Sequence, residues 1–148
     1  MMPIYFYVPS DEHGYLSNFS RHGFAIDGVY WPTVEHYFQA QKAPGTEHEE
    51  RIRRAYTAKD AKRMGRAVPL RPDWEAVKGD VMRRAVEAKF AAHPDLAARL
   101  LATGDEELVE AAPGDFYWGA GADGSGQNRL GQIVMDVRTA LGWDGGTH

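Results

Sequence analysis

A carboxylate, an amide and an ammonium group recur at helical spacing within residues 33–42. Glu35, Gln39 and Lys42 stand at positions i, i+4 and i+7, so a helix places them in one row on the same face. Beside aromatic side chains, such a row can line a polar cleft in which a carboxylate acts on a substrate. The alternative is a first-turn acid favoured by the helix dipole, with Gln39 and Lys42 solvated. The local sequence leaves both interpretations open.

Aromatic residues are concentrated next to Gly, Asp and Asn. They are Trp31, Trp74, Phe116, Tyr117 and Trp118, together with Asn18-Phe19. A planar heterocycle can stack on such rings and still be hydrogen-bonded by neighbouring turn residues. Trp74 follows Asp73, and this pair also suits a helix cap and a hydrophobic staple. Asp115 and Asp123 are turn residues by default, and a catalytic role requires that one of them converge on Glu35.

The segment Gly119–Gly124 matches the dinucleotide pattern G-x-G-x-x-G letter for letter. That pattern needs a preceding buried strand and a following βαβ unit, and only 24 residues follow Gly124. We therefore do not expect a dinucleotide-binding fold, but glycine-rich backbone before a helix can still bind a phosphate through its N–H groups. A mobile surface loop is the alternative.

Several chemistries are disfavoured by what the sequence lacks. The chain has no Cys, which excludes disulfides, thiol nucleophiles, zinc ribbons and iron–sulfur clusters. The six His residues are scattered, and neither a His-Glu-x-x-His helix nor a Gly-x-Ser-x-Gly elbow occurs. We therefore expect neither a metal site nor a cofactor.

Length and charge indicate an ordinary globular domain. The 148 residues carry 17 basic and 21 acidic side chains, a net charge of −4, and 43% are hydrophobic. This charge argues against binding nucleic acid through a bulk positive field. The absence of a signal peptide and of a long apolar run predicts a soluble cytoplasmic protein with no membrane partner. The oligomeric state is not indicated.

The elements that must position these residues follow from local patterns. Ile4–Val8 is typical of a strand, and Asp27-Gly28 between 24–26 and 29–31 predicts a type I′ hairpin. From Pro32 the apolar period becomes helical. We predict helices at 33–43, 47–56, 58–64, 73–92, 96–103 and 127–141, and a strand at 107–111. The fold class is α+β, with a few short, mostly antiparallel strands.

Eight motifs occur in order along nearly the whole chain, from about Tyr5 to Leu141. They are Ser17-Asn18-Phe19, Trp31 to Lys42, Ala61 to Arg66, Trp74 with Met82 and Lys89-Phe90, Leu101 to Gly104, Leu108 to Glu110, Asp115 to Gly119, and Gly126 to Gly131. Together they resemble the YbiA-like (NADAR) family.

The resemblance implies a helix-rich α+β domain that hydrolyses an N-glycosidic bond. Family substrates are 5-phosphoribosylamino-pyrimidines, early intermediates of riboflavin biosynthesis, and in some branches ADP-ribose attached to guanine. By motif, the catalytic carboxylate falls on Glu35, the substrate-packing Trp on Trp74 and a second acid on Asp115. We expect one domain over residues 1–148, with a core at about 5–141 and a frayed tail at 142–148.

The implied reaction passes through an oxocarbenium-like state, which needs negative charge near C1 and a positioned water. Glu35 at a helix N-terminus should stay ionised, which suits a base or electrostatic stabiliser. Asp115 would then handle the leaving amine or the ribose hydroxyls. Direct attack by water predicts a separation of the two carboxylates on the order of 6.5–9.5 Å.

The remaining candidates bind the substrate. Trp74 and Trp118 would stack on the pyrimidine, and the candidates for the 5′-phosphate are Lys42, Lys62, Arg66 and Arg129. Alternatively, Lys62 traps the opened ribose as a Schiff base. The other predicted contacts come from Asn18, Phe19, Gln39, Gly119, Asp123 and Asn128.

Two other functions compete with the one that the resemblance favours. One is hydrolysis of ADP-ribosyl-guanine on nucleic acid. A strip of basic residues that could contact phosphates is consistent with it: Arg51, Arg53, Arg54, Lys59, Lys62, Arg63 and Arg66. Such a strip is more often a solvated helical face. The other is a non-catalytic module that holds ADP-ribose or NAD.

Overall fold

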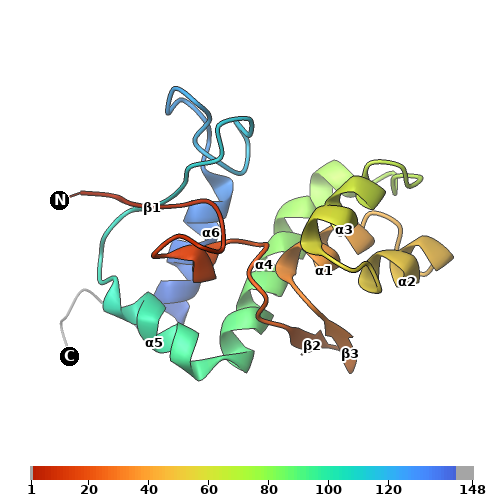
Figure 1. The fold of residues 1–148 in the computed structure, drawn as a ribbon, viewed down its shortest axis with the longest axis horizontal. Coiled ribbons are helices and arrows are strands. Elements are labelled where there is room, and N and C mark those ends of the chain that lie inside the picture. The colour runs from red at the N-terminus through yellow and green to blue at the C-terminus, as the bar shows by residue number, and fades with distance from the viewer. Residues whose placement is uncertain (1, 143–148) are drawn as a thin grey trace. The chain divides into compact units, whose positions relative to one another are not determined.

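The computed structural model describes residues 2–142, so the expected frayed tail lies, apart from Gly142, outside the described residues. The described chain forms two compact units (Figure 1). Unit 1 comprises residues 2–20 and 93–142, and unit 2 comprises residues 21–92. Unit 2 contains β2 (Phe24–Ile26), β3 (Val29–Trp31), α1 (Val34–Ala40), α2 (Glu47–Arg53), α3 (Ala58–Gly65) and α4 (Trp74–Ala92). Unit 1 contains β1 (Ile4–Phe6), the 3₁₀ helix η1 (Gly14–Leu16), α5 (Pro94–Ala102), β4 (Leu108–Glu110) and α6 (Arg129–Ala140).

The predicted hairpin of unit 2 is confirmed. β2 and β3 pair antiparallel, with Phe24 opposite Trp31. Asp27 and Gly28 between them have φ values of 52° and 81°, as a type I′ turn requires. Arg84 of α4 donates to the Asp27 carboxylate at 2.8 Å, which ties this turn to the long helix.

Helix α1 is the centre of unit 2, and α2, α3, α4 and β3 all contact it. Thr33 caps it, because the Thr33 hydroxyl accepts a hydrogen bond from the backbone N–H of His36. Every residue from Val34 to Ala40 is buried. In Figure 1, α2 and α3 lie beside α1.

Helix α3 approaches α1 through small residues. Ala58, Ala61 and Gly65 are buried at spacings of three and four residues. At Gly65 the approach is closest, since a Cβ atom there would lie 2.0 Å from Gln39 Oε1 and 3.0 Å from Gln39 Cβ. This seam leaves Lys62 and Arg66 exposed.

The buried face of α4 contains a lysine. Met82, Ala85, Val86 and Phe90 are buried, and Lys89 between them is only 2% exposed. Burial lowers the pKa of the Lys89 ammonium to about 7.

Unit 1 contains a strand pair that joins distant parts of the chain. β1 pairs with β4 in parallel, with Ile4 opposite Leu108, and α6 packs against β4. The predicted strand at 107–111 is therefore confirmed, whereas the expectation of mostly antiparallel pairing holds only for the hairpin. The predicted α+β class is confirmed. Within residues 2–142 no helix is long and apolar enough to cross a membrane.

Candidate functional site

Glu35 and Gln39 are buried polar residues at the centre of unit 2. Their exposed fractions are 7% and 5%, so the interpretation in which Gln39 is solvated is wrong. A carboxylate and an amide are costly to bury without partners, because each loses its hydrogen bonds to water. Their burial therefore calls for specific partners, and they provide one for each other.

The Gln39 amide holds the Glu35 carboxylate in place. Gln39 Nε2 donates to Glu35 Oε1 at 2.6 Å, one helical turn apart on α1. The Gln39 Oε1 atom is buried and has no hydrogen-bond partner among the described residues. It faces the Gly65 Cα at the seam with α3. The result is a carboxylate oriented by an amide whose own rotamer is limited by a neighbouring helix.

Three of the four predicted cations, Lys42, Lys62 and Arg66, lie near one another in unit 2. Burial lowers the pKa of Lys42, the nearby Glu35 raises it, and Arg66 and Lys62 lower it further. Lys42 therefore lies within electrostatic range of Glu35 on α1 and of Lys62 and Arg66 on α3. One acid and three basic groups suit a substrate that carries an anion at one end and develops positive charge at the other.

A cavity of about 350 Å³ lies at the Lys42 end of the row. Lys42, Ala43, Pro44, Thr46, Pro69, Arg71 and Asp73 line it. Arg71 donates to both carboxylate oxygens of Asp73, at 2.6 and 3.0 Å, and its backbone N–H donates to the Lys42 carbonyl at 2.9 Å. The segment before α4 is thereby fixed to the end of the polar row. Glu35 does not line this cavity.

Trp74 begins α4 and is buried at 5% exposure. Its ring packs against Phe38, with 5.0 Å between ring centroids. Phe38 lies three positions after Glu35, so Trp74 supports the helix face next to the carboxylate. This geometry matches the interpretation of Trp74 as a packing residue, and its contact with a substrate stays a prediction.

The His36 ring connects α1 to the segment after α2 and to the residue that caps α1. Its Nε2 lies 3.0 Å from the Ala55 carbonyl, which can only accept, so Nε2 carries the proton. Nδ1 then accepts from the Thr33 hydroxyl at 2.8 Å. Burial lowers the His36 pKa. His36 is thus a structural residue beside the site.

Asp115 of unit 1 forms a turn, as its sequence context predicts. Its Oδ1 atom accepts hydrogen bonds from the backbone N–H groups of Tyr117 and Trp118, at 3.0 and 2.8 Å. Trp118 is half-buried and meets the Tyr117 ring edge-on, with centroids 4.7 Å apart. Asp115 belongs to unit 1 and Glu35 to unit 2. The convergence of the two carboxylates, and their separation, stay predictions.

The glycine-rich segment uses its backbone amides internally. The N–H groups of Ala120, Gly121, Gly124 and Gly126 all donate to backbone carbonyls of residues 110–121. The first N–H groups of α6 are engaged as well, because Arg129 and Leu130 donate to the carbonyls of Tyr117 and Trp118. These amides do not form the expected phosphate cradle, since each already has a partner.

The other predicted residues of unit 1 have structural partners or lie at its surface. Asn128 has a left-handed backbone, and its side chain joins the Leu108 carbonyl to the Glu110 N–H. Asp123 accepts from the Ser125 N–H and hydroxyl. The predicted contacts of Asn18, Phe19, Gly119, Asp123, Asn128 and Arg129 with a substrate stay untested.

Two features of unit 2 were not predicted from the sequence. Lys89 belongs to one of the family motifs, but its burial was not predicted, because a lysine in a helix is normally assigned to the surface. The role of Arg71 was not predicted because it lies between the helices predicted at 58–64 and 73–92, although its position two residues before Asp73 is a signal for a local ion pair. Within residues 2–142, no group of three or more His, Asp or Glu side chains is arranged to share a metal ion.

Comparison with known proteins gives consistent matches over almost the entire chain. A model of the NADAR domain matches residues 5–142. N-glycosidase YbiA of Escherichia coli strain K12 is 49% identical over 140 residues, which cover 93% of this chain and 88% of that protein. Riboflavin biosynthesis protein VVA0006 of Vibrio vulnificus is 45% identical over 94% of this chain, which corresponds to 38% of that longer protein. The NMR structure of E. coli YbiA matches with a TM-score of 0.86 and 48% identity, over 95% of this chain and 87% of that one.

Proposed function

Because the chain belongs to the NADAR domain family, we propose that it is an enzyme, an N-glycosidase that hydrolyses phosphoribosylamino-pyrimidines of riboflavin biosynthesis. The names of two relatives, an N-glycosidase and a riboflavin biosynthesis protein, support the reaction and the pathway. The substrate is a small phosphorylated ribosylamine, and we place the reaction in the cytoplasm, where a charged phosphate ester is retained.

The observation that carries this proposal is the buried Glu35 carboxylate held by Gln39 at 2.6 Å. As the C1–N bond lengthens, its electron pair moves to nitrogen and positive charge develops at C1 and the ring oxygen. A fixed carboxylate stabilises that charge without reorganising during the reaction. The same carboxylate accepts a proton from the attacking water, whose oxygen forms the new bond to C1.

The leaving nitrogen needs a proton, which we assign to Asp115 as the second acid of the mechanism. At the other end of the substrate, Lys42, Lys62 and Arg66 would bind the 5′-phosphate through charge-assisted hydrogen bonds. Lys42 interacts electrostatically with Glu35 and with both basic residues of α3, which supports this orientation. The cavity beside Lys42 offers room for an anion at that end of the polar row.

A three-substrate assay tests this function. The purified chain is incubated separately with phosphoribosylamino-pyrimidine, ADP-ribosylated guanine in an oligonucleotide, and NAD, and the released base is measured. We expect turnover of the pyrimidine substrate by a large margin. Preferred release of ADP-ribose from guanine would contradict the proposed substrate and favour hydrolysis of ADP-ribosyl-guanine on nucleic acid. Binding of NAD or ADP-ribose without turnover of any substrate would make the chain a binding module.

A further inference from the structure

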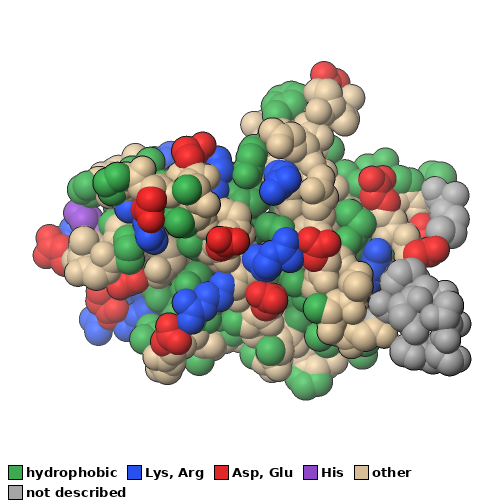
Figure 2. Space-filling model, turned by 180° about the vertical axis from the view of Figure 1, so that it is seen from behind, with side chains coloured by type: hydrophobic (Ala, Val, Ile, Leu, Met, Phe, Trp, Pro, Cys, Tyr) green, Lys and Arg blue, Asp and Glu red, His purple; other side chains and the backbone are tan. Residues whose placement is uncertain are grey.

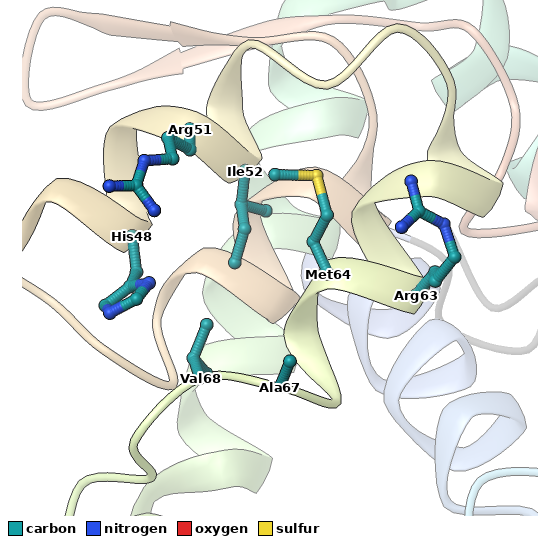
Figure 3. Close-up of a pocket in the computed structure, with 7 residues that line it drawn as sticks. All are labelled: His48, Arg51, Ile52, Arg63, Met64, Ala67 and Val68. Atoms are coloured by element: carbon teal, nitrogen blue, oxygen red, sulfur yellow. The ribbon is translucent and has the colours of Figure 1, made fainter.

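Exposed hydrophobic side chains that occur singly are common on folded proteins. Over the face shown in Figure 2, they are scattered among acidic and basic side chains. A cavity of about 380 Å³ between α2 and α3 is mostly apolar, with Ile52 and Met64 at its centre (Figure 3). Its two arginines, Arg51 and Arg63, stand on opposite sides and do not converge on one ligand. Phe116 of unit 1 differs from these features, because its ring is held in place and presents an open face.

One face of the Phe116 ring lies on the backbone of Gly121. A Cβ atom at Gly121 would lie 2.4, 2.3 and 2.7 Å from Phe116 Cδ1, Cε1 and Cζ. A point beyond the edge of the ring cannot be almost equally close to three successive ring atoms, so this point lies over the ring face. Gly121 has a φ of 72°, which favours glycine, and its missing Cβ leaves the space that the ring occupies.

The other face of the Phe116 ring is open. The side chain is 49% exposed, as expected of a ring with one covered face. Among residues 2–142, no other aromatic ring contacts it. In contrast, Trp74 is 5% exposed against Phe38, and Trp118 is half-buried beside Tyr117. Phe116 is therefore the aromatic side chain of the 115–118 turn with the most surface left for a ligand.

The backbone on both sides of this contact is fixed. The Phe116 carbonyl accepts from the Gln127 N–H at 2.8 Å, and the Gly121 N–H donates to the Ala112 carbonyl at 3.2 Å. The ring and the glycine beneath it thus belong to one hydrogen-bonded loop. A ring that is already held in place loses little conformational freedom when a planar ligand stacks on it.

Phe116 directly follows Asp115, to which protonation of the leaving nitrogen was assigned above. An acid transfers a proton only within hydrogen-bond distance, so the leaving base must lie beside Asp115 and within reach of the neighbouring ring. We propose that Phe116 is a specificity residue of the N-glycosidase, whose open face stacks on the pyrimidine; this inference rests on the proposed function. A planar aromatic base gains from the contact, whereas the ribose phosphate does not.

Separate binding of the two halves of the substrate tests this proposal. The probes are 5,6-diaminouracil for the leaving base and ribose 5-phosphate for the sugar, each titrated into the full chain and followed by NMR at the amides of residues 115–121 and of α3. In Phe116→Ala and Phe116→Leu, we expect the Kd for diaminouracil to rise at least about fivefold and the Kd for ribose 5-phosphate to stay unchanged. Phe116→Tyr keeps the ring and should bind both probes as the unmodified chain does.

Tyr56→Ala serves as the control, because it removes an aromatic ring of unit 2 that is 86% exposed; it should not change either Kd. An unchanged Kd for diaminouracil in Phe116→Ala, or no binding of this base to the unmodified chain, would overturn the proposal. An equal rise in both Kd values would also overturn it, since that result indicates a disturbed loop. Turnover distinguishes the two levels: an active unmodified chain with unchanged base binding in the Phe116 variants refutes stacking alone, whereas an inactive unmodified chain refutes the proposed function.

Discussion

Gln39 Nε2 donates a 2.6 Å hydrogen bond to Glu35 Oε1, and both side chains are buried on α1. The bond joins two residues whose spacing on a helix was visible in the sequence, but its orientation depends on α3. Gly65 of that helix leaves just enough space for the Gln39 amide. The carboxylate is therefore positioned by an amide, and the amide by the close approach of two helices.

A methyl group at Gly65 should disturb the carboxylate from a distance. In Gly65→Ala the new Cβ would meet Gln39 Oε1 at 2.0 Å, so the amide must turn away from Glu35. Loss of a hydrogen bond to a charged group predicts a fall in kcat of about tenfold. Gly79→Ala is the matched control, because nothing lies within 4 Å of its Cβ; it should keep full kcat and gain up to about 1 kcal/mol of stability. Equal kcat values in Gly65→Ala and Gly79→Ala would contradict the claim that the contact of α3 with Gln39 affects the reaction.

The basic residues of α3 should act on the phosphate of the substrate. Lys62→Ala and Arg66→Ala should raise KM for the phosphorylated substrate about tenfold and leave the dephosphorylated ribosylamine unaffected. Lys59→Ala, on the same helix, serves as the control. If Lys62 instead forms a Schiff base with the opened ribose, its substitution lowers kcat by orders of magnitude, and borohydride traps a covalent adduct. Steady-state kinetics with the two substrates distinguishes these outcomes.

Substitution of Trp74 should distinguish packing from stacking. Trp74 is buried against Phe38, so Trp74→Phe keeps an aromatic contact but leaves part of the space empty. A packing role predicts a lower melting temperature with little change in kcat/KM at temperatures where the variant is folded. A stacking role predicts instead that kcat/KM falls by an amount equivalent to roughly 1–3 kcal/mol. Parallel melting curves and kinetics decide between them.

Lys89 should make the stability of the fold depend on alkaline pH. Burial lowers its pKa from 10.5 to about 7, so between these values the unfolded chain binds a proton that the folded chain has released. The free energy of unfolding therefore rises with pH across this window, by about 2 kcal/mol between pH 7 and 9. Urea unfolding should show this rise in the unmodified chain and its loss in Lys89→Met. Lys78→Met, on the same helix and paired with Glu75 in the native chain, should behave as the unmodified chain does.

Local sequence rules predicted the elements that depend on neighbours in the chain. The Asp27-Gly28 turn and the Asp115 turn both follow from backbone geometry within a few residues. The parallel pairing of β1 with β4 did not follow, because it joins segments separated by most of the chain. No local pattern encodes such a partner.

Local sequence patterns also could not predict that the candidate site is buried. The row of Glu35, Gln39 and Lys42 was predicted from helical spacing, but the same spacing also fits a solvated face. Only the packing of α2, α3 and α4 around α1 decides that Glu35 and Gln39 are enclosed. The pairing of Glu35 with Asp115 in the mechanism is a prediction from the family resemblance.

The substitution Glu35→Gln tests the central claim most directly. The amide has nearly the same shape as the carboxylate, so the fold should be retained, with an unchanged melting temperature within a few degrees. Without negative charge near C1, kcat for release of the pyrimidine should fall at least ~10²-fold. A variant that folds normally and keeps more than about a third of the turnover, a change far below that expected of a positioned charged group, would contradict the assignment of Glu35 as the group that stabilises the developing positive charge.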